Sequence, residues 1–242
     1  MSLSIIIPCR NEEESIENTI NEITNHLIKK VNNFEINIIN DFSSDGTLKK
    51  LKIISKRNKK IKIYNNQIRG LGGAINLGIE KSLNKFTVIV MADLSDSPED
   101  IIKYYFEIKN NDLDAVLGTR FCSNSLIENY PKKKLFFNRI FNNLVKILFW
   151  QKYNDFTNAF KIYKTSVLKE LKPIISENFN IFLELPLKII SRKYKYSIIP
   201  VNWRNRKNGE AKFKIKELGS KYLFTLLYCY LEKILLDKKV KK

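Results

Sequence analysis

Histidine and cysteine are scarce in this sequence, which narrows the chemistry it can perform. Of its 242 residues one is a histidine, His26, and three are cysteines, Cys9, Cys122 and Cys229. The cysteines are far apart, odd in number and match no metal-ligand spacing, so we expect a reduced, cytoplasmic protein. These counts exclude His-rich zinc sites and argue against Ser/His and Cys/His catalysis.

Long apolar segments are missing as well. The longest apolar run, near Tyr222–Leu231, is about half of the ~20 residues that span a bilayer, so we expect no integral membrane helix. The apolar run Ile5–Ile7 leads directly into Pro8 and a charged segment, which is not the pattern of a signal peptide. Association with a membrane surface stays open.

Positive charge, in contrast, is abundant and unevenly distributed. The formal net charge is +18, yet residues 1–120 carry 17 basic and 16 acidic residues, which leaves a net of +17 for the rest. Such asymmetry predicts an anionic partner for the second half: nucleic acid, a membrane surface or a phosphorylated substrate. A solvated lysine-rich face explains any single cluster equally well. Because no nucleic-acid-binding motif accompanies the charge, we expect no nucleic-acid partner.

Strand and helix patterns alternate through the first 120 residues. Short apolar runs predict strands at Leu3–Pro8, Phe34–Asn40, Ile61–Tyr64, Phe86–Met91 and Asp114–Thr119. Helical periodicity predicts helices at Glu13–Val31, Thr47–Arg57 and Gly70–Leu83, and a further helix starting at Ser97 with Pro98 in its first turn and a capping box closed by Asp100. This alternation indicates an α/β fold with a wound, mostly parallel, Rossmann-like sheet.

Basic and aromatic residues dominate beyond Phe121. Lys132–Trp150 has the pattern of an amphipathic helix, and Ile215–Leu235 repeats the theme before a lysine-rich tail. The apolar stripe of the first helix consists of Phe137, Ile140, Phe141, Leu144 and Leu148. Core packing and a membrane interface explain such stripes equally well.

The unusual polar residues fall where predicted strands end: the segment Pro8–Glu12, Asp41, Asp93 and Arg120. Ligands of wound parallel sheets bind beyond the carboxyl ends of the strands. Asp41 is suited to accept hydrogen bonds from a base or a ribose, although a turn residue would look the same. The segment Arg69–Ala74 offers backbone N–H groups and a helix start to an anion, with a tight helix start as the alternative.

The segment Met91–Asp96 places carboxylates directly after a buried strand. Carboxylates in that position hold a hard cation, which bridges pyrophosphate oxygens and stabilises the leaving group. A capped loop is the alternative. If the cation is there, Mg²⁺ or Mn²⁺ is expected.

Taken in order, these segments resemble family 2 glycosyltransferases. The resemblance is closest to the dolichyl-phosphate mannosyltransferase branch and its bacterial polyprenyl-phosphate relatives. It rests on Ser4–Glu12, Asn40–Thr47, Ala92–Ser95, Gly118–Arg120, Asp155–Lys161, Phe182–Pro186 and Arg206–Lys212. It implies the nucleotide-sugar fold called GT-A.

The resemblance also implies a role for individual residues. Donor and acceptor binding would fall to Pro8, Asn11, Glu12, Asp41, Arg69, Gly70, Ala92, Arg139 and Lys212. Asp93, Ser95 and Asp96 would hold the metal, and catalysis would rest on Asp93, Arg120 and Arg206.

Three positions depart from the family pattern. Met91 stands where an aspartate is usual, so one expected carboxylate of the metal site is missing and Asp96 is the candidate to replace it. Asn40 replaces the first of two usual acids, and Ala211 replaces a usual serine.

The expected organisation is one GT-A domain in three parts. Residues 1–121 form its nucleotide-sugar half, 122–214 its acceptor half, and 215–242 a C-terminal amphipathic helix with a basic tail. The expected reaction is inverting transfer of a hexose, mannose or glucose, from a nucleotide-sugar to a polyprenyl or dolichyl phosphate, by an enzyme held peripherally on an anionic membrane surface.

A phosphate acceptor is already ionised and needs no general base. Glu184 is a candidate for such a base or for a structural carboxylate paired with a nearby Lys or Arg, and we favour the structural role. Two alternatives remain: transfer to a saccharide hydroxyl in cell-surface polysaccharide synthesis, and a degenerate nucleotide-sugar-binding module, which Met91 favours.

Overall fold

A computed structural model describes residues 2–205 and 215–239 of the chain, and side chains only up to residue 205 and within 219–236. Its centre is a seven-stranded sheet in the order β3-β2-β1-β4-β7-β5-β8, with a separate two-stranded sheet of β6 and β9. The strands are β1 (Ser2–Cys9), β2 (Asn33–Asn40), β3 (Ile61–Asn65), β4 (Phe86–Ile89), β5 (Ala115–Thr119), β6 (Ile127–Glu128), β7 (Lys161–Lys164), β8 (Tyr196–Pro200) and β9 (Trp203–Arg204).

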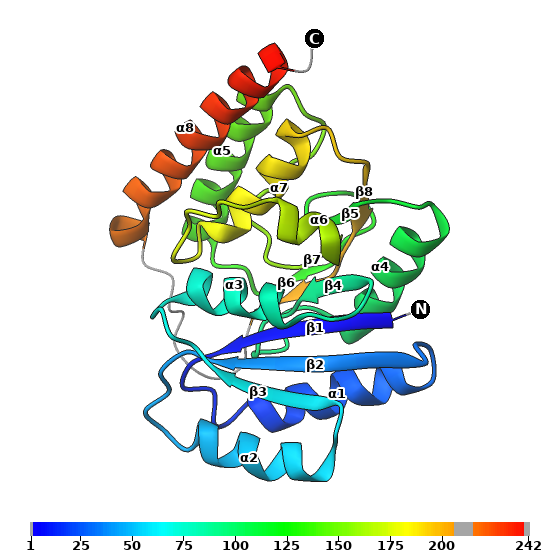
Figure 1. Cartoon of the computed structure of the whole chain (residues 1–242). Helices are drawn as coiled ribbons and strands as arrows, with labels where there is room; N and C mark the ends of the chain where they lie inside the picture. The colour runs from blue at the N-terminus through cyan, green and yellow to red at the C-terminus, as the bar shows by residue number, and fades with distance from the viewer. Residues whose placement is uncertain (1, 206–214, 240–242) are drawn as a thin grey trace.

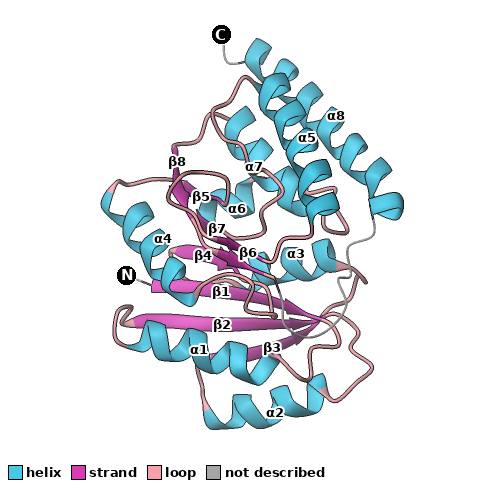
Figure 2. Ribbon diagram, turned by 180° about the vertical axis from the view of Figure 1, so that it is seen from behind, coloured by secondary structure: helices cyan, strands magenta, loops and turns pink. Residues whose placement is uncertain are grey.

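The helices cover both faces of the large sheet (Figures 1 and 2). They are α1 (Ile16–Ile28), α2 (Thr47–Arg57), α3 (Leu71–Lys81), α4 (Pro98–Asn110), α5 (Lys132–Phe149), α6 (Thr165–Glu170), α7 (Ile181–Ser191) and α8 (Ile215–Lys239). One apolar core joins the sheet to α1, α2 and α4, and a second joins it to α3 and the helices from α5 onward. The predicted α/β architecture is confirmed.

Strand β7 is the exception to the parallel sheet. It lies between β4 and β5 and runs antiparallel to both, whereas β1, β2, β3 and β4 pair in parallel, as do β5 and β8. The carboxyl ends of β1, β2, β4 and β5 therefore meet at one edge. The loop that leads into β7 is brought to the same edge, because an antiparallel strand starts where its parallel neighbours end.

The predicted elements of the first half are present with small shifts of their bounds. Helix α2 has the predicted bounds, and Pro98 opens α4 as expected. The capping box at Ser97 was a wrong prediction, since no side chain caps α4. The Asp100 carboxylate instead accepts from Lys103 Nζ at 2.6 Å and from the N–H of Asn202 at 3.0 Å, so it ties α4 to the segment after β8.

The apolar stripe predicted on α5 packs against the core only in part: Phe141 and Leu148 are partly buried against the second core. The buried side chains of this helix are Asn142, Val145 and Phe149, while Phe137, Ile140 and Leu144 are about half exposed. Asn142 is tolerated there because its amide donates to Asn138 and Thr157. Core packing therefore explains Phe141 and Leu148, but not the three exposed residues of the stripe.

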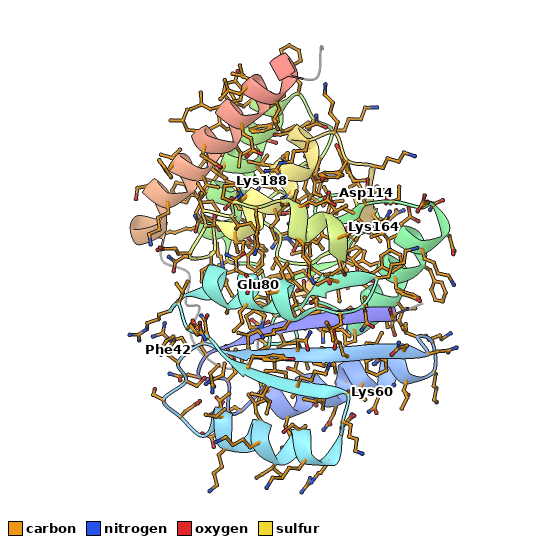
Figure 3. The ribbon with its side chains drawn as sticks, viewed as in Figure 1. Phe42, Lys60, Glu80, Asp114, Lys164 and Lys188 are labelled. Carbon is orange, nitrogen blue, oxygen red and sulfur yellow. The ribbon has the colours of Figure 1, made fainter. Side chains whose placement is uncertain are left out.

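Helix α8 is attached to α7 by a buried ion-pair network. Lys188, labelled in Figure 3, is fully buried, and its Nζ lies 3.1 Å from Glu184 Oε1 and 3.7 Å from Glu232 Oε2. Glu184 Oε2 also accepts from the N–H of Ser176 at 2.8 Å. Glu184 is thus paired with a lysine, in the structural position expected for it.

Buried tyrosines give the fold a pH limit. Burial raises the pKa of Tyr104, Tyr153 and Tyr163 well above the ordinary value. These raised pKa values do not reduce the unfolding free energy below pH ~10, the pKa of a tyrosine in the unfolded chain. Above that pH the unfolding free energy falls, because the unfolded chain loses its phenolic protons before the folded chain does.

We therefore expect Tyr163→Phe to resist alkaline unfolding. Above pH ~10, each buried tyrosine steepens the fall in unfolding free energy by up to about 1.4 kcal/mol per pH unit. Urea unfolding at several pH values above 9 should show a shallower decline for Tyr163→Phe than for the natural chain. Identical declines would mean that Tyr163 does not resist ionisation in the folded state.

Candidate active site

The residues predicted to bind the nucleoside lie where β1 and β2 end, and hydrogen bonds hold them together. The N–H of Asp41 donates to Cys9 O at 2.8 Å, which joins the two strand ends. Asn11, with φ of 52°, accepts from the N–H of Ser44 at 2.8 Å, and the N–H of Glu12 donates to Thr47 Oγ1 at 2.9 Å. These bonds bring Asn11 and Glu12 together with Asp41 beyond Pro8, which is buried in β1.

Asp41 also shapes the start of α3. Its Oδ1 accepts from Asn66 Nδ2 at 2.7 Å and from the N–H of Gly70 at 2.9 Å. Gly70 has φ of 128°, and a Cβ there would lie 2.5 Å from Glu177 O, so only glycine fits. The N–H of Gly72 donates to that same oxygen at 2.8 Å. Two donors that the sequence assigned to an anion are therefore already engaged, and Arg69 beside them is exposed.

A pair of carboxylates follows β4. Asp93 Oδ1 accepts from the N–H of Ser95 at 3.1 Å, and Asp96 is 4% exposed. Burial and then the negative charge of Asp93 raise the pKa of Asp96 to about 7, against the opposing charge of Arg120. The preceding Ala92 is buried, and its carbonyl accepts from Thr19.

These residues fit a divalent cation that takes most of its ligands from substrate. Within the described residues no three His, Cys, Asp or Glu side chains cluster as a metal site. Two neighbouring carboxylates repel each other, however, and a hard cation with oxygen ligands relieves that repulsion. Magnesium commonly binds through one or two carboxylates plus substrate phosphates. Asp93 and Asp96 supply that number, while Met91 faces the same cavity without a charge.

Arg120 is held by an aspartate 35 residues away. Its Nε donates to Asp155 Oδ2 at 2.8 Å, its Nη2 to Oδ1 at 2.6 Å, and its backbone N–H to Oδ2 at 2.9 Å. Asp155 is fully buried and Arg120 is 7% exposed. Burial opposes the charged guanidinium, but the Asp155 carboxylate outweighs it and raises the pKa of Arg120. In the sequence, Asp155 stood out only as part of the segment Asp155–Lys161.

Aromatic rings and a buried lysine complete this corner. The Arg120 guanidinium lies 5.3 to 5.9 Å from the ring centroids of Phe121, Tyr130 and Trp203. Lys161 donates to the carbonyls of Phe156 and Asn158, which fixes the loop that carries Asp155. Burial lowers the pKa of Lys161 to about 7, despite the nearby Asp155.

A second arginine lies next to the first. The Arg139 guanidinium is 4.2 Å from the Phe121 ring centroid, and its Nη1 donates to Asn154 O at 3.0 Å. The Phe121 ring therefore contacts both Arg120 and Arg139. Arg206 and Lys212 lie outside the described residues. The described chain approaches the site up to Asn205, with the N–H of Arg204 donating to Ser95 O at 3.0 Å.

A cavity of about 460 Å³ joins these charged groups to the helices α5 and α8. Its polar end is lined by Asp93, Ser95, Asp96, Arg120 and Trp203, and Lys134 of α5 is a further charged residue of the lining. Its apolar end is lined by Phe137, Ile140, Phe141, Leu144, Phe179, Phe182, Tyr222 and Leu223. We call this cavity the groove. Glu184 is absent from its lining, so its position gives no support to a catalytic base.

Removing one partner of the Arg120–Asp155 pair should destabilise the fold more than replacing both partners with apolar residues. Asp155→Asn leaves Arg120 buried without a full counter-charge, which should lower the unfolding free energy by about 3–5 kcal/mol. Replacing both partners in Arg120→Met/Asp155→Leu should cost clearly less, because no buried charge remains. Urea unfolding of the natural chain, Asp155→Asn and the double variant measures the three unfolding free energies. An equally stable Asp155→Asn would show that the pair does not hold the site.

Known proteins resemble this chain over most of its length. A model of the family described as glycosyl transferase family 2 matches residues 4–172. The dolichol-phosphate mannosyltransferase of Pyrococcus furiosus is 29% identical over 90% of this chain and 61% of its own length. The UDP-N-acetylglucosamine–dolichyl-phosphate N-acetylglucosaminyltransferase of Methanococcus voltae is 27% identical over 96% of this chain and 97% of its own length.

A third relative, the dodecaprenyl-phosphate galacturonate synthase of Rhizobium johnstonii, is 25% identical over 71% of this chain. The chain spans only 61% of the Pyrococcus protein and 50% of the Rhizobium protein. Among the described residues, no helix is both long and apolar enough to cross a membrane.

Solved structures share the fold at low identity. Glucosyl-3-phosphoglycerate synthase from Mycobacterium tuberculosis, solved with Mn²⁺, UDP and phosphoglyceric acid, superposes with a TM-score of 0.71 at 15% identity. The alignment covers 95% of this chain and 78% of that protein. The fold is therefore that of the GT-A glycosyltransferases, and the family match over residues 4–172 shows that this chain belongs to glycosyl transferase family 2.

Proposed function

We propose that this chain transfers a hexose, mannose or glucose, from a nucleotide-sugar to a polyprenyl phosphate. The observation that carries the proposal is the groove, which is charged at one end and apolar at the other. A polyprenyl phosphate has the same polarity, with an anionic head and a hydrocarbon tail. Such a lipid would place its phosphate near Arg120 and its first isoprene units between Ile140 and Leu223.

The relatives support this acceptor. Three of them carry the names of enzymes of dolichol, dolichyl or dodecaprenyl phosphate. A lipid acceptor also implies that the chain works at the periphery of a membrane. The donor would lie at the other end of the site, with its nucleoside near Asn11 and Asp41 and its diphosphate toward Asp93.

Transfer to a phosphate acceptor would depend on positive charge to bind the phosphate groups, and not on a general base. An oxygen of the acceptor phosphate forms a bond to the anomeric carbon, while the bond from that carbon to the nucleoside diphosphate breaks and its electrons leave with the diphosphate. No proton has to be removed from an ionised phosphate. Arg120 and Lys134 line the groove, and Arg139 shares the Phe121 ring with Arg120. In this proposal these cations would bind the two phosphate groups, since guanidinium groups bind phosphate oxygens in pairs.

Asp93 and Asp96 would hold Mg²⁺ or Mn²⁺ in this scheme. The cation would neutralise charge on the leaving diphosphate, which the chain's own groups near the carboxylates do only in part. Arg120 shares its charge with Asp155, so its field at the diphosphate is weakened.

The experiment that tests the function offers acceptors side by side. A panel of radiolabelled nucleotide-sugars is incubated with a polyprenyl phosphate, the matching polyprenol and a soluble saccharide. We expect label only in the phosphate product, with a rate nearly flat above pH ~6, the second phosphate pKa. Equal labelling of the alcohol or the saccharide would replace this function with transfer to hydroxyls. No turnover with any acceptor would leave a binding module.

A second prediction concerns the cation. EDTA should abolish transfer and Mg²⁺ or Mn²⁺ should restore it. Asp93→Asn should lower turnover roughly 100-fold or more while the midpoint of thermal unfolding stays near that of the natural chain. Asp96→Asn should weaken the metal dependence, and Met91→Asp should do no harm. Full activity of Asp93→Asn, or activity indifferent to EDTA, would remove the metal from the scheme.

A further inference from the structure

Helices α5 and α8 expose an apolar surface that their own packing does not use. It consists of Phe136, Phe137, Ile140, Leu144, Ile147 and Trp150 from α5 and its C-cap, and of Leu223, Phe224, Leu227, Leu231, Ile234 and Leu235 from α8. We call these residues the apolar face. Single exposed apolar residues are ordinary, but a contiguous group of this size marks an interaction surface.

The two helices are already joined on their inner sides. The rings of Phe141 and Tyr222 meet edge to face at 5.7 Å, and those of Phe149 and Tyr230 at 6.0 Å. Figures 1 and 2 both show α5 and α8 lying side by side at the end of the molecule opposite α2. The apolar face therefore remains free to contact another body.

The charges around the apolar face identify that body. Its exposed charged residues are Lys132, Lys133 and Lys146 on α5 and Lys221 on α8, and no exposed acidic residue occurs among the described side chains of either helix. Among the described side chains, a second copy docked on this face would bring exposed lysines toward exposed lysines with no exposed carboxylate of α5 or α8 to pair with them. An anionic bilayer offers acyl chains to the apolar residues and phosphate groups to the lysines.

Trp150 strengthens the assignment. It is 89% exposed and caps α5 in the left-handed conformation, with φ of 54°. A tryptophan ring that is so exposed to water gains almost none of the free energy of apolar burial. At a membrane interface its ring is favoured between acyl chains and headgroups.

We propose that the apolar face inserts into the outer acyl region of an anionic bilayer. Four of its residues, Phe137, Ile140, Leu144 and Leu223, also line the groove. The groove would then open directly into the lipid, and a polyprenyl phosphate would enter sideways from the bilayer with its phosphate leading toward Arg120. Only this last step rests on the proposed function; the insertion itself does not.

The chain contains two tryptophans, Trp150 and Trp203, which makes the insertion measurable. In Trp203→Phe the remaining tryptophan reports on the apolar face, and in Trp150→Phe it reports on the groove. Each chain is mixed with phosphatidylglycerol–phosphatidylcholine vesicles whose acyl chains carry bromine. We expect bromine to quench Trp150 strongly and Trp203 much less. Absence of quenching of Trp150 would overturn the proposal.

Flotation with the same vesicles gives a second readout, without donor or polyprenyl phosphate, so that it is independent of turnover. Ile147→Glu/Leu227→Glu changes two residues of the apolar face that do not line the groove. We expect it to lower the bound fraction roughly tenfold or more. The control Ile53→Glu changes an apolar residue that is 45% exposed on α2, and it should bind like the natural chain.

Vesicle binding at high salt distinguishes insertion of apolar residues from electrostatic adsorption. About 1 M NaCl reduces the Debye length to about 3 Å and should weaken binding only in part, because the apolar contacts are not screened. Complete release by salt would overturn insertion and leave surface adsorption. A natural chain that stays off vesicles and sediments as a dimer, with Ile147→Glu/Leu227→Glu monomeric, would overturn it in favour of a second copy.

Discussion

The bidentate ion pair between Arg120 and Asp155 connects the two halves of the chain at the point where the chemistry is expected. Arg120 follows β5, and Asp155 stands in the loop that enters β7. Because β7 runs antiparallel between β4 and β5, that loop lies beside the ends of both strands. The pair fixes the loop there, and Lys161 Nζ also holds the loop by donating to the carbonyls of Phe156 and Asn158. The polar end of the groove depends on this arrangement.

The pair also sets the electrostatics of the site. A guanidinium that is matched by a buried carboxylate contributes less positive field than a free one, while Asp96 beside it is buried against Asp93. In the proposed function, a cation would offset the charge of the two carboxylates and the acceptor phosphate would lie near Arg120. The apolar end of the groove adds the complementary requirement for a hydrocarbon tail. Head and tail of a lipid phosphate thus correspond to the two ends of one cavity.

Much of this arrangement followed from the sequence, because it depends on local periodicity. Apolar runs and helical patterns located the strands and helices of the first half, and parallel strands necessarily bring Asp41, Asp93 and Arg120 to one edge. What the sequence did not reveal were long-range partnerships. Nothing in the local sequence links Asp155 to Arg120, which lies 35 residues away. The short β7 does not indicate its antiparallel direction. The Asp100 carboxylate, predicted to cap α4, instead accepts from the N–H of Asn202. Periodicity also could not distinguish an apolar stripe that faces the core from one that faces outward, as on α5.

The central claim is that the groove receives an amphiphile with its phosphate at Arg120 and its tail at the helices. It is tested most directly by photolabelling with a polyprenyl phosphate that carries a diazirine in an isoprene unit near the phosphate, followed by mapping of the labelled peptides. We expect labelling in α5 and α8 at groove residues such as Ile140, Leu144 and Leu223, and loss of that labelling when unmodified polyprenyl phosphate competes. Labelling that spares these residues, or that polyprenol without phosphate displaces equally well, would contradict it.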